Sequence, residues 1–329
     1  MIAENFRGAG GWAEAIARLR ESVESLRVAA RGVELDPEAW QTATEAGHDV
    51  VQADVAGMHP RDLVDADCTG YIASPPCPSF SGAGLKRGID DLPLVRYLVR
   101  ELAQGRDHRA TACPSDPRSL LTAEPMRWVQ ELEPRWVVLE QVPAVLPVWQ
   151  DMATIMRARG YSAWTGVLNA ECYGVPQQRQ RAILLASRER TVGEPVATHR
   201  RYYPPRQRAS WDPPDSHLPS WRSMADEIEE WAPADLIGFA RRNDRDDGHT
   251  HRVRDLRHAS LPAFTLTEKA RSWARVHDGE TLRVSVDDAA QLQGFRRGYP
   301  WQGSRSRKFH AIANAIPVGL AEACLREVT

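Results

Sequence analysis

The sequence predicts an α/β fold with a mostly parallel, doubly wound sheet and a second, smaller, loop-rich domain. Two observations indicate the sheet. A glycine-rich turn at residues 6–11 separates a short strand from a helix with apolar residues at helical spacing. Three apolar runs further along the chain each end in an acidic residue, namely Glu34, Asp54 and Glu140. Buried parallel strands end in this way where their carboxyl ends face a ligand cleft.

Length and composition set the class of protein. With 329 residues, of which 42% are hydrophobic, the chain can bury the core of one large domain and one smaller domain. No apolar run approaches the roughly 20 residues of a membrane span, and the start lacks the segments of a signal peptide. The 5 cysteines form no C-x-x-C pair, which argues against a disulfide framework and against a zinc site. We therefore expect a cytoplasmic protein without a metal or a membrane partner.

The glycine turn is the first element with a chemical meaning. It contains Phe6, Gly8, Gly10 and Gly11, and the spacing of the apolar residues predicts a helix over residues 12–26. Glycines let the backbone approach a ligand closely at the positive end of a helix. The pattern Gly8-x-Gly10-x-x-Ala13 also fits the dinucleotide fingerprint, so a nicotinamide dehydrogenase is the competing interpretation of this segment.

The next two strands end in carboxylates. Residues 28–33 predict a second strand that leads to Glu34, where a carboxylate can accept hydrogen bonds from both hydroxyls of a ribose. Residues 50–54 predict a third strand with Asp54 at its tip. Either type of nucleotide cofactor would use Glu34, so these residues by themselves leave the choice of cofactor open.

A stiff turn follows the fourth strand, which we expect at residues 70–73. The turn reads Ser74-Pro75-Pro76-Cys77-Pro78, and prolines fix φ and remove backbone donors. Cys77 is therefore held in one place at the end of a strand, which suits a nucleophile that faces a cleft. The alternative is a buried structural cysteine, because free cysteine is among the most buried residue types.

The central strand and the strand after it carry further candidates. Residues 137–140 predict a buried parallel strand that ends in Glu140. Since open α/β sheets bind ligands at the carboxyl ends of their strands, Cys77 and Glu140 should meet there. Residues 173–176 predict a turn, and residues 181–186 a strand that begins with Arg181, two residues after Arg179.

Arginines gather in the region that follows. The net charge of -2 does not by itself indicate nucleic acid, but arginines cluster at residues 188–208 and 241–257. Guanidinium groups match phosphates and guanine edges, so both clusters are candidate DNA contacts; a solvated arginine-rich surface is the alternative. The expected small core of this region consists of Trp211, Trp221, Trp231 and Trp273.

Two helices should complete the chain. The first lies within residues 286–295 and ends at Gly294, and the second runs from Phe309 through Leu325.

Taken in order, these segments resemble the motifs of the cytosine-C5 DNA methyltransferases over almost the whole chain. The resemblance rests on Phe6-Arg7-Gly8-Ala9-Gly10-Gly11, Glu34, Asp54, Pro76-Cys77, Leu139-Glu140-Gln141-Val142, Gln177-Gln178-Arg179-Gln180-Arg181, Leu292-Gln293-Gly294-Phe295 and Asn314-Ala315-Ile316-Pro317. It implies a Rossmann-like class I methyltransferase domain at residues 1–186, a target-recognition domain at 187–284, and a segment 285–329 that returns to the first domain. It also implies a bacterial or phage-encoded, intracellular enzyme of restriction-modification type that acts as a monomer on double-stranded DNA.

The resemblance also implies a cofactor and a set of site residues. The donor would be S-adenosyl-L-methionine, which leaves as S-adenosyl-L-homocysteine, and no metal takes part. The expected cofactor-binding residues are Phe6, Gly8, Gly10, Gly11, Glu34, Leu35, Asp54, Pro76 and Asn314, with Asp54 at the adenine amino group. The expected catalytic residues are Cys77, Glu140, Arg179 and Arg181. Cys77 would attack C6 of a flipped cytosine, while Glu140 holds N3, Arg181 holds O2 and Arg179 supports the cleft.

Several alternatives stay open or fall away. A dehydrogenase needs no nucleophilic thiol at the fourth strand, whereas a tRNA cytosine-C5 methyltransferase shares all of these motifs. A zinc deaminase needs P-C-x-x-C and His-x-Glu, but Phe80 takes the second cysteine position and no His-x-Glu occurs. The chain departs from the family where Gln141 replaces asparagine, which leaves a modified sulfonium donor open, and where Ala313 replaces glycine. Residues 86–116 are longer than the usual catalytic loop, with a predicted amphipathic helix over 92–102.

Overall fold

The computed structural model describes residues 1–64, 67–76, 87–203, 215–242 and 251–329. These residues form two compact units, each of which consists of several chain segments. The first contains Met1–Leu168, Gln180–Val196 and Ala321–Thr329, and the second contains Asn169–Arg179 and Ala197–Leu320. Of the predicted segment 285–329, residues 285–320 therefore belong to the second unit, and only Ala321–Thr329 belong to the first. The functional roles assigned to residues 1–186, 187–284 and 285–329 stay predictions.

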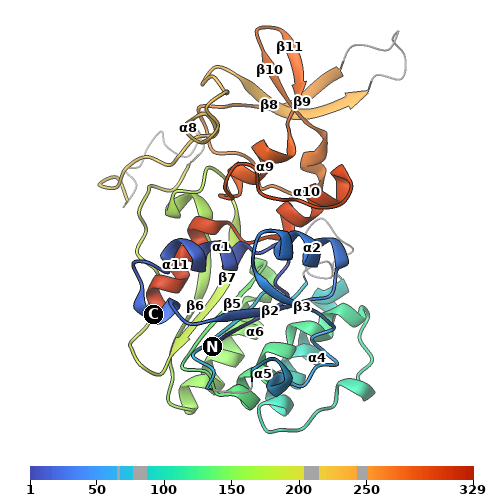
Figure 1. Cartoon of the computed structure of the whole chain (residues 1–329), viewed down its shortest axis with the longest axis vertical. Coiled ribbons are helices and arrows are strands. Elements are labelled where there is room, and N and C mark those ends of the chain that lie inside the picture. The colour runs from blue at the N-terminus through green and yellow to red at the C-terminus, as the bar shows by residue number, and fades with distance from the viewer. Residues whose placement is uncertain (65–66, 77–86, 204–214, 243–250) are drawn as a thin grey trace. The chain divides into compact units, whose positions relative to one another are not determined.

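A seven-stranded sheet forms the centre of the first unit in the described part of the chain, with the order β3-β2-β1-β4-β5-β7-β6 (Figure 1). Its strands are β1 (Ile2–Asn5), β2 (Ala30–Glu34), β3 (Asp49–Gln52), β4 (Gly70–Ala73), β5 (Trp136–Gln141), β6 (Ser162–Asn169) and β7 (Gln180–Ser187). Strands β1 to β5 are mutually parallel, and β7 runs antiparallel to β5. The predicted α/β class with a mostly parallel sheet is confirmed.

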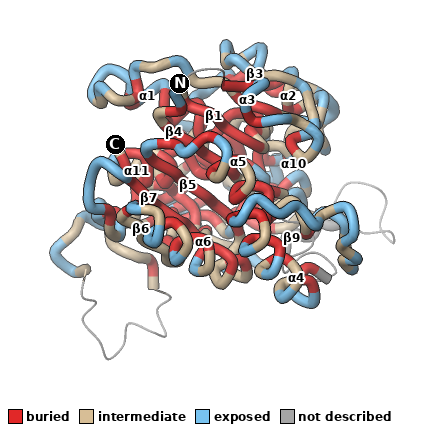
Figure 2. The backbone as a smooth tube through the Cα atoms, turned by 90° about the horizontal axis from the view of Figure 1, so that it is seen from below, coloured by how far each residue is buried: buried red, intermediate tan, exposed pale blue. Residues whose placement is uncertain are grey.

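Helices cover both faces of this sheet, as a doubly wound fold requires (Figure 1). One face carries α1 (Gly11–Leu19), α2 (Pro37–Glu45) and the last part of α11 (Val318–Val328). The other face carries α4 (Arg87–Leu102), α5 (Glu124–Leu132) and α6 (Leu146–Ala158), whose apolar side chains form one core with the strands. The central strands β1, β4 and β5 are buried along their length, and most of β7 is buried as well (Figure 2), whereas β3 and β6 at the two edges of the sheet are mostly half-buried or exposed. The shorter helices are α3 (Pro60–Leu63), η1 (Glu24–Leu26), η2 (Arg109–Thr111), η3 (Pro117–Thr122) and η4 (Pro143–Val145).

The first helix is shorter than the sequence predicted. It ends at Leu19 rather than at Leu26, and the Leu19 carbonyl accepts the backbone N–H groups of Ser22 and Val23 and the Ser22 hydroxyl, at 2.8–3.2 Å. Val23 then adopts an extended conformation before η1 begins. The apolar spacing continued past the helix because η1 buries Leu26 in its own turn.

An antiparallel sheet of four strands, in the order β11-β10-β8-β9, lies in the second unit within the described residues. Its strands are β8 (Leu236–Arg242), β9 (His251–His258), β10 (Trp273–His277) and β11 (Glu280–Arg283). The helices of this unit are η5 (Ala170–Tyr173), α8 (Met224–Glu227), η6 (Glu268–Ser272), α9 (Val286–Leu292) and α10 (Arg305–Asn314). The described chain has no helix that is both long and apolar enough for a membrane span.

The tryptophan core of the second unit is confirmed in part. Trp273 is buried, with the rings of Phe239 and Phe264 edge-on to it at 5.9 and 6.3 Å, and Trp231 is also buried. Trp221 is half-buried edge-on against a tyrosine ring, and Trp211 lies outside the described residues.

The closing helix predicted from Phe309 through Leu325 is wrong as a single element, since it divides into α10 and α11. Ala315 has the extended ψ of 147° that residues near a proline favour, and Pro317 directly precedes α11. Gly294 is left-handed, with φ of 89°, just beyond the end of α9 as expected.

Candidate active site

Three left-handed residues shape the turn between β1 and α1. Phe6, Gly8 and Gly10 have φ of 56°, 59° and 104°. A bulky side chain rarely adopts such a φ, so Phe6 holds strained backbone of the kind that gathers at ligand sites. A Cβ added to Gly8 would meet no described protein atom within 4 Å, so this backbone stands open to a ligand. The turn therefore fits the close approach that a nucleotide cofactor requires.

Glu34 ties the second strand to this turn. Its Oε2 accepts the backbone N–H of Gly8 at 2.7 Å, and its Oε1 accepts that of Asp36 at 2.8 Å. Burial raises the pKa of the Glu34 carboxyl, and the N–H groups of Asp36 and Gly8 act in the opposite direction. Each carboxylate oxygen has a second lone pair, so Glu34 can still accept hydroxyl donors from a ribose.

The residues expected around an adenine lie along the same edge of the sheet. Asp54 follows β3, and its Oδ1 accepts the backbone N–H of Ala56 at 2.9 Å, which shapes a short loop. Leu35 follows Glu34 and is 62% exposed, an unusual position for a large apolar side chain. An apolar side chain beside a carboxylate suits a flat base with an exocyclic amino group.

The turn after β4 is anchored by two side chains. Trp12 donates its indole N–H to the Ser74 hydroxyl at 2.9 Å, and the Gln141 amide donates to the Pro75 carbonyl at 2.6 Å. Gln141 is only 3% exposed, and its amide oxygen accepts the backbone N–H of Val142. Pro76 is described and half-buried, whereas Cys77 lies outside the described residues. Gln141, which stands where the family that this chain resembles has asparagine, thus holds the backbone at Pro75, two residues before Cys77.

Glu140 and Arg181 form an ion pair. Arg181 Nε lies 2.6 Å from Glu140 Oε1, and the two side chains are 11% and 7% exposed. The register explains the contact, since Glu140 pairs with Ile183 across the antiparallel β5 and β7, so that β7 begins where β5 ends. Two residues predicted to be catalytic therefore meet at the carboxyl edge of the sheet. A guanidinium held by a carboxylate presents fixed donors, as recognition of a polar base edge requires.

Arg179 has a different environment from the one that sequence reasoning suggested. It is buried in the second unit, where it donates to the carbonyls of Leu266 at 2.8 Å, Ala313 at 2.5 Å and Ala315 at 3.4 Å. Its guanidinium thus binds backbone within its own unit and joins two distant segments. Asn314 also belongs to the second unit, is exposed, and its amide lies 2.9 Å from His310 Nε2.

Two buried glutamines lie beside Arg179, and both were recognised in the sequence as motif residues without being assigned a role. Gln177 donates to Gln293 Oε1 at 2.6 Å and accepts the backbone N–H of Leu266 at 2.8 Å, and Gln293 donates to the Ala315 carbonyl. Both glutamines are fully buried. Three motifs recognised separately in the sequence are therefore one hydrogen-bond network in the second unit. The only available signal was that glutamine is rarely buried unless paired.

A feature that sequence reasoning missed lies under the glycine turn. Arg7 forms a buried ion pair with Glu4 at 2.9 Å and donates to the Asp49 carbonyl at 2.8 Å. A Cβ on Gly32 would lie 2.1 Å from Arg7 Nε, so only glycine leaves room for this side chain. Burial raises the pKa of Glu4, whereas Arg7 lowers it. The glycine inside β2 was the signal in the sequence.

The described arginines of the two clusters include some that make contacts within the protein. Arg257 is half-buried, donates to Gln178 Oε1 and to the Pro262 carbonyl, both at 2.8 Å, and lies 3.8 Å from the centre of the Phe264 ring. It therefore stabilises the second unit. Arg188 lies over the Tyr161 ring in the first unit, and Arg206, Arg208 and Arg245 lie outside the described residues.

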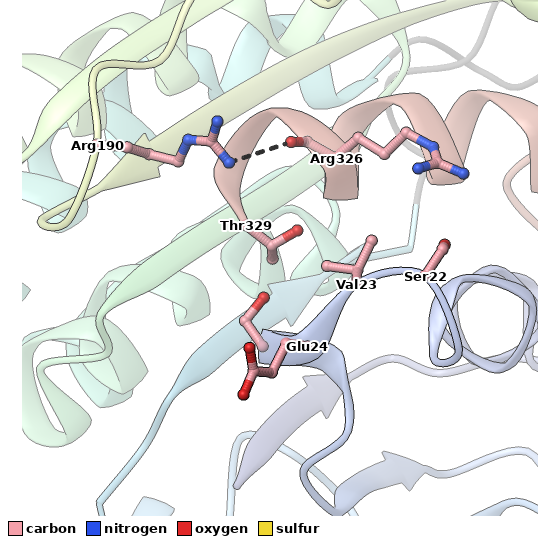
Figure 3. Close-up of a pocket in the computed structure, with 7 residues that line it drawn as sticks. Ser22, Val23, Glu24, Arg190, Arg326 and Thr329 are labelled. Atoms are coloured by element: carbon pink, nitrogen blue, oxygen red, sulfur yellow. Dashed lines mark hydrogen bonds between the residues drawn. The ribbon is translucent and has the colours of Figure 1, made fainter.

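A separate pocket of about 580 Å³ occurs at the other edge of the sheet, where the parallel strands begin (Figure 3). It is lined by Ser22, Val23, Glu24, Ser25, Arg190, Arg326 and Thr329, and Arg190 donates to the Arg326 carbonyl at 3.5 Å. This pocket shares no lining residue with the predicted site. The described residues contain no group of three or more His, Cys, Asp or Glu side chains arranged to hold a metal.

Comparisons with known proteins agree with this geometry. A sequence model of the family described as C-5 cytosine-specific DNA methylase matches residues 1–94 and 111–329, so that only 95–110 have no counterpart. Type II methyltransferase M.FnuDI of Fusobacterium nucleatum is 25% identical, with 88% of this chain and 84% of the relative covered. Type II methyltransferase M.Eco47II of Escherichia coli is 24% identical, with 99% and 78% covered. A solved methyltransferase of Entamoeba histolytica shares the fold, with a TM-score of 0.63, 12% identity, and 99% and 96% covered.

Proposed function

This chain belongs to the C-5 cytosine-specific DNA methylase family and is a DNA (cytosine-5-)-methyltransferase. From this premise we propose that it methylates C5 of a cytosine flipped out of double-stranded DNA, through a covalent bond between Cys77 and C6. The observation that carries the proposal is the Glu140–Arg181 pair, which lies at the same sheet edge as the anchored turn that leads to Cys77. By analogy with its relatives, the enzyme belongs to a Type II system.

The methyl donor of the family is S-adenosylmethionine, whose sulfonium supplies the methyl group, and the residues of the glycine turn fit it. The open backbone at Gly8 would approach the amino acid part, and Glu34 would accept the ribose hydroxyls. Leu35 would cover the adenine while Asp54 accepts its amino group. Phe6, Gly10 and Gly11 would shape this pocket, and Pro76 and Asn314 complete the proposed set.

The base would be activated by addition and elimination. Cytosine C5 is a poor carbon nucleophile, so the Cys77 thiolate forms a bond to C6 and converts the ring to an enamine. Glu140 holds N3 and Arg181 holds O2 as the electron density rises. C5 then forms its bond to the methyl group while the donor's methyl–sulfur bond breaks. Loss of the C5 proton to a base and of the Cys77 thiolate restores the aromatic ring. Because C6 is inaccessible in a duplex, the cytosine must be flipped out of the stack. The loss of stacking and pairing costs a few kcal/mol, which contacts in the pocket must offset.

Residues 187–284 would choose the DNA sequence. Strands β8 and β9 of the second unit carry arginines at paired positions, such as Arg241 opposite Arg252. Such positions suit phosphates and guanine edges. Guanidinium groups can read base edges, whereas phosphate contacts only position the duplex.

Methylation with labelled S-adenosylmethionine tests the proposal. We expect label in duplex DNA as 5-methylcytosine at one short sequence and none in transfer RNA, and sequencing locates the sites. Exchange of residues 187–284 for those of a related enzyme should move the methylated sequence with the exchanged region. Label in transfer RNA alone would replace this proposal with the tRNA methyltransferase, the second candidate.

Gln141 provides a prediction specific to this chain. In Gln141→Met the volume of the side chain is kept but the bond to the Pro75 carbonyl is lost, so we expect kcat to fall about tenfold, the effect of roughly one net hydrogen bond. Affinity for S-adenosylhomocysteine should not change, which calorimetry checks. Gln141→Asn, which is one methylene shorter, is the matched variant. The relative use of S-adenosylmethionine and its carboxylated analogue by both variants tests the modified-donor alternative. Wild-type kcat in Gln141→Met would contradict an anchoring role.

A further inference from the structure

A buried carboxylate joins two arginines beside the loop that carries Asp54. Glu124 begins α5, and its side chain is 1% exposed. Its Oε2 lies 2.8 Å from Arg127 Nε, and its Oε1 contacts the Arg109 guanidinium. Arg109 is paired on its other side with Asp107 at 2.6 Å. A buried carboxylate is destabilising unless cations stay next to it. Movement of either arginine away from Glu124 would therefore cost free energy, so the three side chains hold one another in place.

Both arginines reach the backbone that follows Asp54. Arg127 Nη2 donates to the Val55 carbonyl at 2.8 Å, and Arg109 Nη1 lies 3.5 Å from the Ala56 carbonyl. The Ala56 N–H in turn binds Asp54 Oδ1 at 2.9 Å. A short path of charge-assisted and backbone bonds therefore runs from Glu124 to the Asp54 carboxylate. Such bonds are stronger than neutral ones, because one partner carries a full charge.

Part of this support comes from a segment that the family model leaves unmatched. Residues 95–110 include Asp107 and Arg109, whereas Glu124 and Arg127 lie in the matched region. The residues on either side of this segment are joined by Asp91, whose carboxylate accepts the N–H of Ser115 at 2.7 Å and the hydroxyl of Ser119 at 2.7 Å. The described part of the insertion predicted at residues 86–116, namely 87–116, is therefore folded as part of the first unit, and Arg109 reaches the Asp54 loop.

We propose that Arg109 and Arg127, joined through Glu124, are positioning residues that hold the Asp54 loop for recognition of the adenine amino group of the methyl donor. The inference rests on the proposed function, in which Asp54 accepts that amino group. Neither arginine contacts the donor. They act through the Val55 and Ala56 carbonyls, so their effect should be confined to the part of the ligand that Asp54 reads.

The test compares two product analogues that differ at that amino group. S-adenosylhomocysteine carries the 6-amino group, and S-inosylhomocysteine has a 6-oxo group in its place. Calorimetry on the full chain measures both dissociation constants for the wild type, Arg109→Met, Arg109→Lys and Asp54→Ala. Arg106→Met is the matched control, because Arg106 lies in the same segment but pairs with Glu101 at 2.7 Å. The binding stoichiometry reports the folded fraction of each variant.

We expect Arg109→Met to raise the dissociation constant of S-adenosylhomocysteine about tenfold and to leave that of S-inosylhomocysteine unchanged. The ratio, defined as the constant of S-inosylhomocysteine divided by that of S-adenosylhomocysteine, should therefore fall. Arg109→Lys should restore part of the ratio, since it keeps the charge without the fork. An unchanged ratio in Arg109→Met, or an equal loss for both ligands, would overturn the inference as long as Asp54→Ala lowers the ratio. An unchanged ratio in Asp54→Ala would instead refute the proposed role of Asp54, and the inference with it.

Discussion

Replacement of Cys77 by serine is expected to abolish methyl transfer, with a loss of about 10⁴-fold or more, the effect of removing a catalytic nucleophile. A hydroxyl at neutral pH supplies almost no anion, whereas a thiol is a few per cent ionised and intrinsically nucleophilic. Cys77 would add to C6 and must leave again after the C5 proton is lost. A duplex with 5-fluorocytosine at the target blocks that last step, because fluorine cannot leave as a proton does. The wild type should then form a complex that survives denaturant and migrates as one species.

The chain contains a suitable control for this experiment. Cys113 is an exposed cysteine of the first unit, so Cys113→Ser should keep full activity and form the complex. Cys77→Ser should form none, yet still bind S-adenosylhomocysteine with wild-type affinity. Substantial methylation by Cys77→Ser would exclude the covalent mechanism while leaving the family assignment intact.

Glu140→Gln is expected to lower kcat by about 10²-fold to 10³-fold, within the range typical of a positioned acid or base. Glutamine keeps the shape of the side chain but cannot form the ion pair that Glu140 makes with Arg181 at 2.6 Å. The ring would lose its N3 partner, and the guanidinium expected at O2 would lose the carboxylate that orients it. Single-turnover methylation measures the chemical step, and calorimetry with S-adenosylhomocysteine should show unchanged affinity because neither residue belongs to the proposed donor pocket.

The controls for this prediction separate chemistry from stability. Asp151→Asn breaks an ion pair of similar length, 2.8 Å to Arg96, between α6 and α4. It should leave kcat unchanged, and its thermal midpoint shows what such a loss costs the fold. Arg181→Lys keeps a charge near Glu140 but not the planar fork, so it should lose activity with little change in stability. A Glu140→Gln enzyme with wild-type single-turnover rate would remove Glu140 from the mechanism.

Local patterns in the sequence were sufficient to predict six of the seven strands that the described residues form in the sheet of the first unit, and one edge of the site, but not the edge strand β6. The apolar runs that end in Glu34 and Glu140 could be recognised as strands because a buried parallel strand is short, apolar and continuous. The glycine turn could be recognised because left-handed φ values favour glycine, as at Gly8 and Gly10, whereas the left-handed Phe6 could not be recognised in this way. Parallel strands end at a common edge, so the meeting of Glu34 with the turn followed from topology.

Local sequence patterns could not predict where the first helix ends or which partners the long polar side chains bind. The first helix ends at Leu19, and Val23 is extended, although the apolar spacing continues to Leu26. The two arginines of the Gln-x-Arg-x-Arg motif stand two positions apart, yet Arg181 pairs with Glu140 while Arg179 binds backbone in the second unit. Nothing in the motif itself distinguishes these two uses.

The sequence by itself determined the α/β class, the strands that lead to Glu34, Asp54 and Glu140, and the family of the enzyme, because short-range periodicity, turn chemistry and motif order carry that information. Tertiary structure alone decided which partners the buried polar groups found. Gln141 reaches Pro75 across 66 residues, and Arg127 reaches Val55 across 72. A buried donor that finds no acceptor costs about 1–3 kcal/mol, so such donors are nearly always paired. Which carbonyl accepts the bond depends on which strands and helices the fold brings together.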